Sequence, residues 1–278
     1  MNGAIWLASY PKSGNTWLRS ALYALRHDRS DFTLLDLATF GSIHATYGHI
    51  DRWLEIESGN LTDDEAEAIR PDFYATFFGQ RRDSIPSKVH DAWSRTRSGR
   101  PLFDASFTHA AIYILRDPRD IVVSWSKFFG YSIDQAIDTL SDLNAALAVD
   151  KARRSTQLRQ KLGTWSQHVV SWVDESELSP TVIRYEDMLA DPGLAFRRVC
   201  KAIGWESDEA AIQSAIHSAS FDKLAALERQ YGFGEVADRT ERFFRAGKAG
   251  SWRDLLTGDQ VMRIERDHGE VMRRFGYC

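Results

Sequence analysis

The chain has 278 residues, of which 43% are hydrophobic and 27% charged, and its formal net charge at pH 7 is -4. This composition is typical of a globular protein with a large core, and we expect a single domain over residues 1–278. The negative charge argues against nucleic acid as a partner, and no apolar run reaches the roughly 20 residues of a membrane span. With two cysteines and an apolar segment that starts at Ala4, we expect neither disulfides nor a secretory signal, but a cytoplasmic protein.

The predicted elements alternate between short strands and helices. Four apolar runs are typical of buried strands: Ala4 to Ser9, Ser87 to His90, Ala110 to Leu115 and Thr181 to Tyr185. Helical spacing follows the first run, resumes at Pro118 and at Pro192, and returns near the end, where we expect Asp259 to cap the last helix. Because the strands lack polar alternation, they indicate an α/β fold with a central parallel sheet flanked by helices on both faces.

Three less regular regions separate these elements. They comprise Asp28 to Pro86, Gly130 to Leu162 and Glu228 to Lys248. Insertions of this kind on an α/β scaffold often form the walls and the lid of a binding site. We therefore expect a pocket that is walled by helical and loop insertions.

The joint between the first strand and the first helix reads YPKSGNTW, residues 10–17. The first amide groups of a helix have no partners within the helix and carry partial positive charge, so they attract anions. Gly14 permits close backbone approach, Lys12 adds a full positive charge, and Ser13 and Thr16 can donate hydrogen bonds. We interpret the loop as an anion site, with an ordinary turn as the alternative. It is not the GxxxxGK[ST] loop, because its lysine precedes the glycine.

A second joint repeats this plan. The apolar strand ends at Leu115, Arg116 follows it, and Pro118 begins a helix. Ser124 lies two helical turns beyond Arg116, so a guanidinium fork and a hydroxyl could hold one phosphate. Two anion sites at the carboxyl ends of parallel strands suit a nucleoside with phosphates at both ends.

Four segments together resemble the sulfotransferases that use 3'-phosphoadenosine 5'-phosphosulfate (PAPS). YPKSGNTW is similar to the family's 5'-phosphosulfate loop, and LRDPRDIVVSW at 115–125 to its 3'-phosphate motif. RYEDM at 184–188 resembles the third nucleotide-contacting segment, and FFRAGKAGSW at 243–252 resembles the RKGxxGDW loop. The matches follow the family's order over nearly the whole chain, and the resemblance implies a P-loop-like nucleotide-binding fold.

The resemblance implies that PAPS is the donor cosubstrate and that no metal is needed. The residues that it assigns to the nucleotide are Lys12, Ser13, Gly14, Asn15, Thr16, Trp17, Arg116, Ser124, Tyr185, Phe221, Arg245 and Gly247. The first six would form the phosphosulfate loop, Arg116 and Ser124 would hold the 3'-phosphate, and two aromatic residues, Tyr185 and Phe221, would contact the adenine. From the sequence itself, no His, Cys or carboxylate cluster has metal-ligand spacing.

The resemblance also implies a catalytic set. Lys88-Val89-His90 aligns with the family's Lys-Thr-His segment, which makes His90 the general base and Lys88 a second cation near the transferring group. Lys12 and Ser124 complete the implied set. A histidine titrates in the range needed to accept a hydroxyl proton, and an ammonium group neutralises charge on a leaving phosphate. The implied reaction moves a sulfuryl group in line from PAPS to the hydroxyl of a small or medium-sized alcohol or phenol.

Some positions depart from the family pattern. Val89 replaces the threonine beside the histidine, while Ala246 and Ser251 replace the lysine and the aspartate of RKGxxGDW. We therefore expect a weaker loop over the 3'-phosphate unless Lys248 compensates. Two other functions stay open, namely a nucleotide-dependent phosphotransferase or kinase and a nucleotide-binding protein without turnover. The sequence leaves the oligomeric state open.

Aromatic residues are frequent in the regions that are expected to wall the pocket. They are Phe40, Tyr47, Trp53, Phe73, Tyr74, Phe77, Phe78 and Trp93. They favour an aromatic or otherwise apolar acceptor, but core packing explains many of them equally well.

Overall fold

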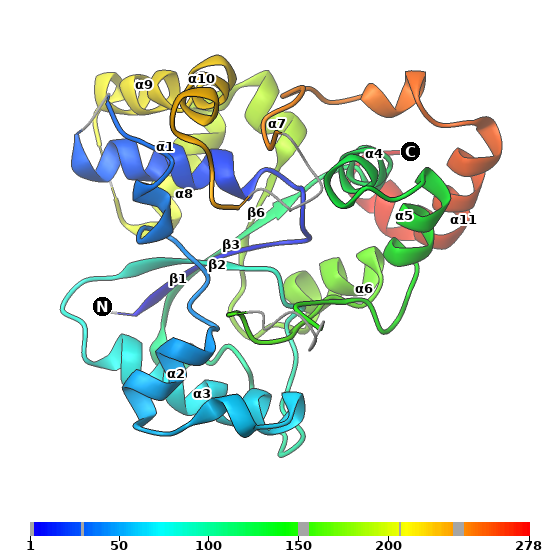
Figure 1. Cartoon of the computed structure of the whole chain (residues 1–278). Helices are drawn as coiled ribbons and strands as arrows, with labels where there is room; N and C mark the ends of the chain where they lie inside the picture. The colour runs from blue at the N-terminus through cyan, green and yellow to red at the C-terminus, as the bar shows by residue number, and fades with distance from the viewer. Residues whose placement is uncertain (1–2, 29–30, 150–155, 206, 236–241) are drawn as a thin grey trace.

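Four parallel strands form the central sheet of the computed structural model, which describes residues 3–28, 31–149, 156–205, 207–235 and 242–278 (Figure 1). The strands are β1 (Ala4–Ser9), β2 (Ile85–Val89), β3 (Thr108–Leu115) and β6 (Thr181–Arg184). Their order in the sheet is β2-β1-β3-β6, and all three pairings are parallel. The four predicted strands and the parallel sheet are confirmed, with β2 ending one residue before His90.

Helices follow or connect the strands. The α-helices are α1 (Asn15–His27), α2 (Tyr47–Leu54), α3 (Asp63–Gly79), α4 (Pro118–Phe129), α5 (Ile133–Leu140), α6 (Trp165–Val170), α7 (Tyr185–Ala190), α8 (Pro192–Ile203), α9 (Glu209–Ser218), α10 (Phe221–Tyr231) and α11 (Gly258–Arg274). Short 3-10 turns lie at Asp36–Ala38, Ser58–Asn60, Ala105–Phe107 and Ser251–Asp254, and a π-helical turn lies at Ser171–Glu175. Two further strands, β4 (Ala146–Leu147) and β5 (Gln160–Lys161), pair antiparallel outside the main sheet. In the parts of the chain that the structure describes, no helix has both the length and the apolar character needed to cross a bilayer.

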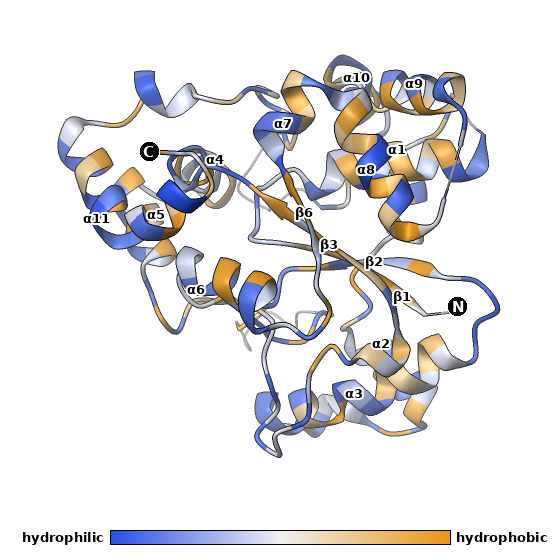
Figure 2. Cartoon of the chain, turned by 180° about the vertical axis from the view of Figure 1, so that it is seen from behind, coloured by the Kyte–Doolittle hydropathy of each residue, from blue (hydrophilic) through white to orange (hydrophobic). Residues whose placement is uncertain are grey.

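Different helices cover the two faces of the sheet. In Figure 2 the strands, which are largely apolar, lie between these helices. Successive residues of a strand point to opposite faces. Leu7 therefore packs with Leu22 of α1 and Val199 of α8, in the core that α9 and α10 also share. Trp6 points the other way, and its ring lies 5.1 Å from that of Tyr74 and 5.2 Å from that of Phe78, both on α3.

The predicted start of the last helix is wrong by two residues. Thr257, not Asp259, is the N-cap of α11, and its hydroxyl accepts a hydrogen bond from the amide of Gln260 at 3.3 Å. The Gln260 side chain in turn accepts from the Thr257 amide at 3.1 Å. This reciprocal capping box satisfies two amide groups at once, which is why it prevails over a single aspartate.

Candidate active site

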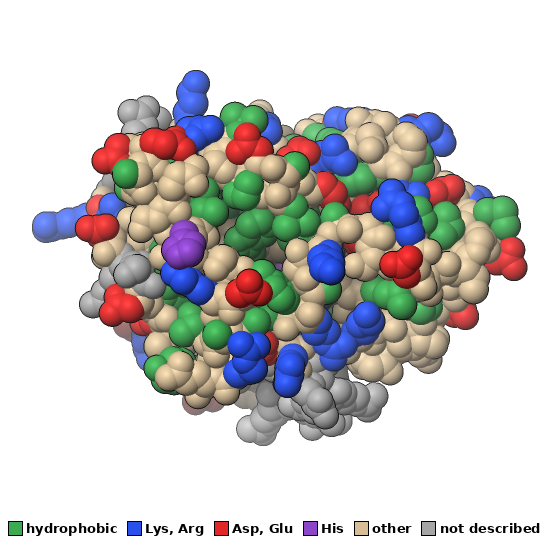
Figure 3. Space-filling view, turned by 90° about the horizontal axis from the view of Figure 1, so that it is seen from above, with side chains coloured by type: hydrophobic (Ala, Val, Ile, Leu, Met, Phe, Trp, Pro, Cys, Tyr) green, Lys and Arg blue, Asp and Glu red, His purple; other side chains and the backbone are tan. Residues whose placement is uncertain are grey.

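A cavity of about 1010 Å³ opens at the carboxyl ends of the main strands. Lys12, Lys88, Arg116 and Tyr185, which line it, come from the ends of β2 and β6 and the loops after β1 and β3. Each of the three insertions also contributes lining residues, as the sequence predicts. Figure 3 shows one face of the molecule on which hydrophobic side chains surround a central hollow.

The structure brings nearly all the predicted site residues to this cavity. Those that line it are Lys12, Gly14, Asn15, Thr16, Trp17, Lys88, His90, Arg116, Ser124, Tyr185, Phe221, Arg245 and Gly247. Ser13 lies between two of them, and its hydroxyl is buried with no hydrogen-bond partner among the described residues. A buried hydroxyl of this kind can still donate to a bound anion.

The loop after β1 has the backbone shape of an anion cradle. Gly14 is the N-cap of α1 with φ 102°, and a Cβ atom there would lie 2.6 Å from the Tyr185 ring, so only glycine fits. Within the described chain no side chain caps α1, which leaves its first amide groups for a ligand. The Asn15 side chain instead turns inward and donates to the Leu7 carbonyl at 2.7 Å, which fastens the loop to β1.

The Lys12 ammonium lies between two aromatic rings. Its Nζ atom is 3.7 Å from the centre of the Phe128 ring and 4.1 Å from that of Phe243. Burial, followed by repulsion from Lys88 and Arg116, lowers the pKa of Lys12 to about 7. A bound anion would reverse this effect, because it favours the charged form of the lysine.

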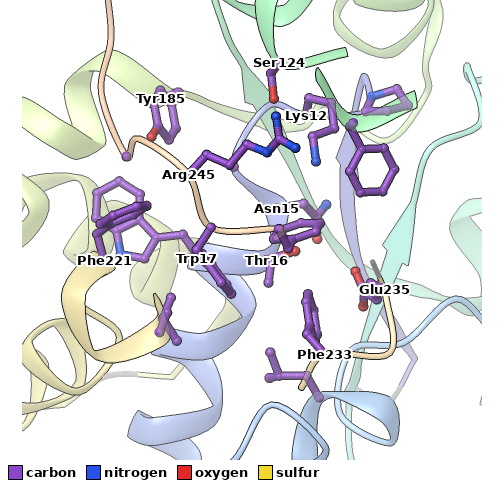
Figure 4. A pocket seen from close by; sticks show the side chains of 18 of the residues that line it. Lys12, Asn15, Thr16, Trp17, Ser124, Tyr185, Phe221, Phe233, Glu235 and Arg245 are labelled. Carbon is purple, nitrogen blue, oxygen red and sulfur yellow. The ribbon is translucent and has the colours of Figure 1, made fainter. Parts of the chain in front are cut away.

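Arg116 connects the two predicted anion loops. It donates to the Lys12 carbonyl at 2.8 Å and to the Lys248 carbonyl at 3.1 Å, and its guanidinium carbon lies 4.2 Å from the centre of the Tyr185 ring. Its Nε atom is buried and has no partner in the described parts of the chain. Arg245 reaches between Ser124 and Lys12 in Figure 4. Cations of three motifs thus surround one part of the cavity.

Aromatic rings lie beside these cations. The Trp17 and Tyr185 rings are edge to face with their centres 5.9 Å apart, and Figure 4 places Phe221 next to Trp17. Gly247 has φ 58°, and a Cβ atom there would overlap the Phe221 ring. Flat side chains next to glycines leave a slot of the kind that holds a planar base.

His90 follows β2 directly and is held by its backbone and by one ring nitrogen. Its Nδ1 lies 2.9 Å from the Ser9 carbonyl oxygen, which can only accept, so Nδ1 carries the proton and Nε2 is the free acceptor. Burial, with added repulsion from Lys88, holds the pKa of His90 well below its usual value, so the ring is neutral at pH 7. The His168 ring donates to the His90 carbonyl at 3.0 Å.

The residue after His90 is anchored by a buried ion pair. The two guanidinium nitrogens of Arg70 each lie 2.8 Å from a carboxylate oxygen of Asp91. Both side chains are almost fully buried, 1% and 4% exposed. This bidentate pair fixes the backbone from which the imidazole of His90 projects.

Residues 2–276 match the family described as Sulfotransferase domain. The chain belongs to the sulfotransferase family. Cytosolic sulfotransferase 17 of Arabidopsis thaliana is 25% identical, over 98% of this chain and 75% of its own length. Flavonol 3-sulfotransferase of Flaveria bidentis is 25% identical, over 94% of this chain and 79% of its own length.

Two solved structures with bound PAP share this fold. The crystal structure of mouse sulfotransferase SULT7A1 complexed with PAP has a TM-score of 0.61 at 18% identity and covers 98% of this chain and 84% of that one. Retinol dehydratase in a complex with retinol and PAP has a TM-score of 0.60 at 17% identity, over 97% of this chain and 81% of that one. The fold expected from the resemblance is therefore confirmed.

The aromatic wall that the sequence suggested for this sulfotransferase is wrong. None of the eight aromatic residues is among the described residues that line the cavity. Instead they pack in or against the two cores. Tyr74 and Phe78 of α3 pack on Trp6 of the sheet, and Phe77 packs on Trp53 of α2. The cavity has another set of apolar residues, here named the apolar lining: Leu34, Leu37, Ile43, Phe128, Phe129, Leu147, Phe233, Phe243 and Phe244.

Sequence reasoning also missed carboxylates that hold the sulfotransferase site together. Asp120 of α4 accepts from the backbone amides of Gly250 and Trp252 at 2.6 and 3.1 Å, which anchors the loop that lacks the usual aspartate. Glu228 of α10 accepts from the amides of Phe243 and Phe244. For Glu228 a signal was available, because it shares a helix face with Leu224 and Ala225. Across the described residues, no group of three His, Cys, Asp or Glu side chains could hold a metal ion.

Proposed function

We propose that this sulfotransferase moves a sulfuryl group from PAPS to a hydroxyl of a small or medium-sized acceptor, with His90 as the general base. The observation that carries the proposal is the convergence of His90, Lys12 and Lys88 on the cavity that contains the uncapped start of α1. A base and two ammonium groups beside one anion site are what sulfuryl transfer requires.

The nucleotide part of the cavity fits PAPS by its chemistry. The unpartnered Ser13 hydroxyl and Arg116 Nε, together with the free amides at the start of α1, supply donors for phosphate oxygens. The rings of Trp17, Tyr185 and Phe221 supply flat surfaces for a purine. We assign Lys12 to Trp17, Arg116, Ser124, Tyr185, Phe221, Arg245 and Gly247 to the nucleotide on this basis.

The proposed mechanism follows from the residues that line the cavity. His90 Nε2 accepts the proton of the acceptor hydroxyl while the acceptor oxygen bonds to sulfur. The bond between sulfur and the bridging phosphate oxygen breaks, and PAP leaves. Lys12 and Lys88 stabilise the charge on that oxygen. The Ser124 hydroxyl lines the same cavity and can donate a hydrogen bond to the phosphates. The bond from His90 Nδ1 to the Ser9 carbonyl stabilises the imidazolium after proton transfer.

The apolar lining supports an apolar or aromatic alcohol or phenol as the acceptor. The names of curated relatives, which include a flavonol 3-sulfotransferase, agree with this acceptor class. The name of the cytosolic relative supports a cytoplasmic location, and the family match over residues 2–276 supports one domain.

Calorimetric titration with PAP and, separately, with ATP tests the nucleotide class first. We expect PAP to bind and ATP to bind far more weakly, because ATP has no 3'-phosphate for the cations of Arg116 and Arg245. Preference for ATP would support the phosphotransferase alternative. Transfer of labelled sulfate from PAPS to a panel of phenols and alcohols then tests turnover, and its absence from every acceptor would support a binding protein.

His90→Ala tests the base. We expect transfer to fall by roughly 100-fold or more while PAP binding is unchanged, since His90 removes a proton from the acceptor. His27→Ala, which changes an exposed histidine at the end of α1, is the matched control. Undiminished turnover in His90→Ala would remove His90 from the mechanism.

A further inference from the structure

Glu235 joins two buried cations at the wall of the cavity. One of its carboxylate oxygens lies 2.7 Å from Lys88 Nζ, and the other lies 2.5 Å from a guanidinium nitrogen of Arg19. Arg19 also donates to the Gly41 carbonyl at 3.0 Å. This cluster, named here the Glu235 bridge, connects α1, β2 and the segment after α10. Figure 4 shows Glu235 on the side of the cavity opposite Tyr185.

The Glu235 bridge keeps charges in a place where they are otherwise costly. The Arg19 side chain is fully buried and that of Lys88 is 11% exposed. Burial lowers the pKa of Lys88, and the Glu235 carboxylate opposes this effect. Although burial alone raises the pKa of a carboxyl, the two cations hold that of Glu235 well below its usual value. The carboxylate therefore stays charged and favours the ammonium form of Lys88.

We propose that Glu235 is a positioning residue for sulfuryl transfer, which holds the Lys88 ammonium charged and in place at the end of β2. The inference rests on the proposed function of the site. Arg19 fixes one oxygen of Glu235, so the other oxygen has a defined position for Lys88. Two cations and one carboxylate leave one net positive charge, which Lys88 presents to the cavity that it lines.

An opposite role for Glu235 is that it occupies Lys88 until a donor anion displaces it. The burial of Arg19 argues against this role. Its partners in the described chain are the Gly41 carbonyl and Glu235, so movement of the carboxylate would leave a fully buried guanidinium without a counter-charge. Retention of the bridge during turnover is the less costly arrangement.

The other charged groups near Lys88 matter for a test by pH. Lys12 from the loop after β1, Arg19 from α1 and His90 at the end of β2 all interact with it electrostatically. Lys12 is in turn affected by Glu235, Arg116 and Arg245. A test must therefore separate the titration of Lys88 from that of Lys12.

The experiment measures the pH profile of kcat for sulfuryl transfer in Glu235→Gln and Glu235→Asp. Loss of the negative charge in Glu235→Gln lowers the pKa of Lys88 further, so we expect kcat to fall at least about tenfold and its alkaline limb to move to lower pH. Glu235→Asp keeps the charge and should retain most of the alkaline limb. Glu270→Gln, on an exposed position of α11, is the matched control and should have the profile of the unmodified protein.

Lys88→Arg distinguishes the two lysines, because a guanidinium does not titrate in this range. In the Lys88→Arg background we expect Glu235→Gln to move the alkaline limb no further. A displacement of the same size in that background would assign the effect to Lys12 and overturn the proposal. Equal loss of kcat at every pH would also overturn it, because that is the signature of a purely structural role.

Two further outcomes keep this test separate from that of the proposed function. If the unmodified protein neither binds PAP nor transfers sulfate, the proposed function fails before any variant is measured. If it does both and Glu235→Gln transfers as fast or faster, only the positioning role is overturned. Should Glu235→Gln not fold, the comparison of Glu235→Asp with Glu270→Gln decides. The shorter carboxylate of Glu235→Asp holds Lys88 less closely, so a small displacement of its alkaline limb to lower pH supports the positioning role, and a pH profile identical to that of Glu270→Gln overturns it.

Discussion

The cations of the cavity and its apolar lining come from different kinds of segment in the chain. Lys12, Lys88 and Arg116 lie within a few residues of a strand end, where the sheet positions the backbone before any other contact is made. The apolar lining comes largely from the three insertions, with Phe128 and Phe129 at the end of α4. The difference teaches that the charged part is a local property of strand–helix joints, whereas the apolar part depends on how distant segments pack.

This difference has a chemical counterpart. Under the proposed function, the charged part is the part that holds the phosphates of the nucleotide, and strand ends provide rigid positions for it. Under the same proposal, the apolar lining is the part that receives the acceptor, and insertions can change without disturbing the sheet. Changes to the two parts should therefore affect different kinetic constants.

The largest effect in this comparison is expected from Arg116→Ala. PAP affinity should fall roughly 10- to 100-fold, because the change removes a charge and the link between the Lys12 and Lys248 carbonyls. Affinity for a nucleotide without the 3'-phosphate should fall less. Calorimetry of both ligands measures this, with the exposed Arg266→Ala as control. Equal losses would mean that Arg116 acts through the loops alone.

A smaller effect on PAP affinity is expected from a rise in pH. The pKa of Lys12 is lowered to about 7 in the free protein, so its ammonium loses the proton as pH rises above that value. An anion requires the charged form, so PAP binding should take up a proton and weaken by at most about tenfold for each pH unit above this point. Calorimetry in buffers of different ionisation enthalpy measures the proton uptake.

Lys12→Arg is the control for this pH dependence. The guanidinium stays charged, so the variant should lose the proton uptake that belongs to residue 12. The phosphates of PAP titrate equally with both proteins, and the difference between them isolates the lysine. Identical proton uptake by both proteins would contradict the expectation that part of Lys12 is neutral in the free protein.

The sequence was sufficient to predict much of the charged part. A lysine before a glycine at a strand end, and an arginine at another strand end, can be interpreted as anion-binding residues from the adjacent residues alone. The parallel sheet then brings these ends together, because the carboxyl ends of parallel strands share an edge. The Glu235 bridge could not be predicted in this way. Arg19 and Glu235 are 216 residues apart, and no local pattern connects them.

The error over the aromatic wall has a physical reason. A phenylalanine that faces a core and one that faces a cavity contribute the same residue type to the sequence. Phe73, Tyr74, Phe77 and Phe78 are spaced as one stripe of a helix, which is the pattern of a face packed on a core. Tyr74 and Phe78 of that stripe contact Trp6 on the sheet. The spacing therefore indicated core packing, whereas the aromatic composition alone did not.

The smallest effect on function is expected from two matched changes, Phe129→Ala and Phe77→Ala. Phe129 is half-buried and lines the cavity, so its loss should raise the KM for an apolar acceptor several-fold, which corresponds to about 1 kcal/mol of lost apolar contact. Phe77 is 4% exposed within the core, so its loss should cost roughly 3–5 kcal/mol of stability.

Steady-state kinetics and denaturant unfolding on the same samples separate these two effects. At a temperature where both variants are folded, Phe77→Ala should keep the acceptor KM of the unmodified protein, because its ring contacts Trp53, Phe78 and Arg81 away from the cavity. Phe129→Ala should keep most of the stability. An acceptor KM that rises in Phe77→Ala and not in Phe129→Ala would restore the aromatic wall to the residues that the sequence first suggested, and would remove Phe129 from the apolar lining as a determinant of acceptor binding.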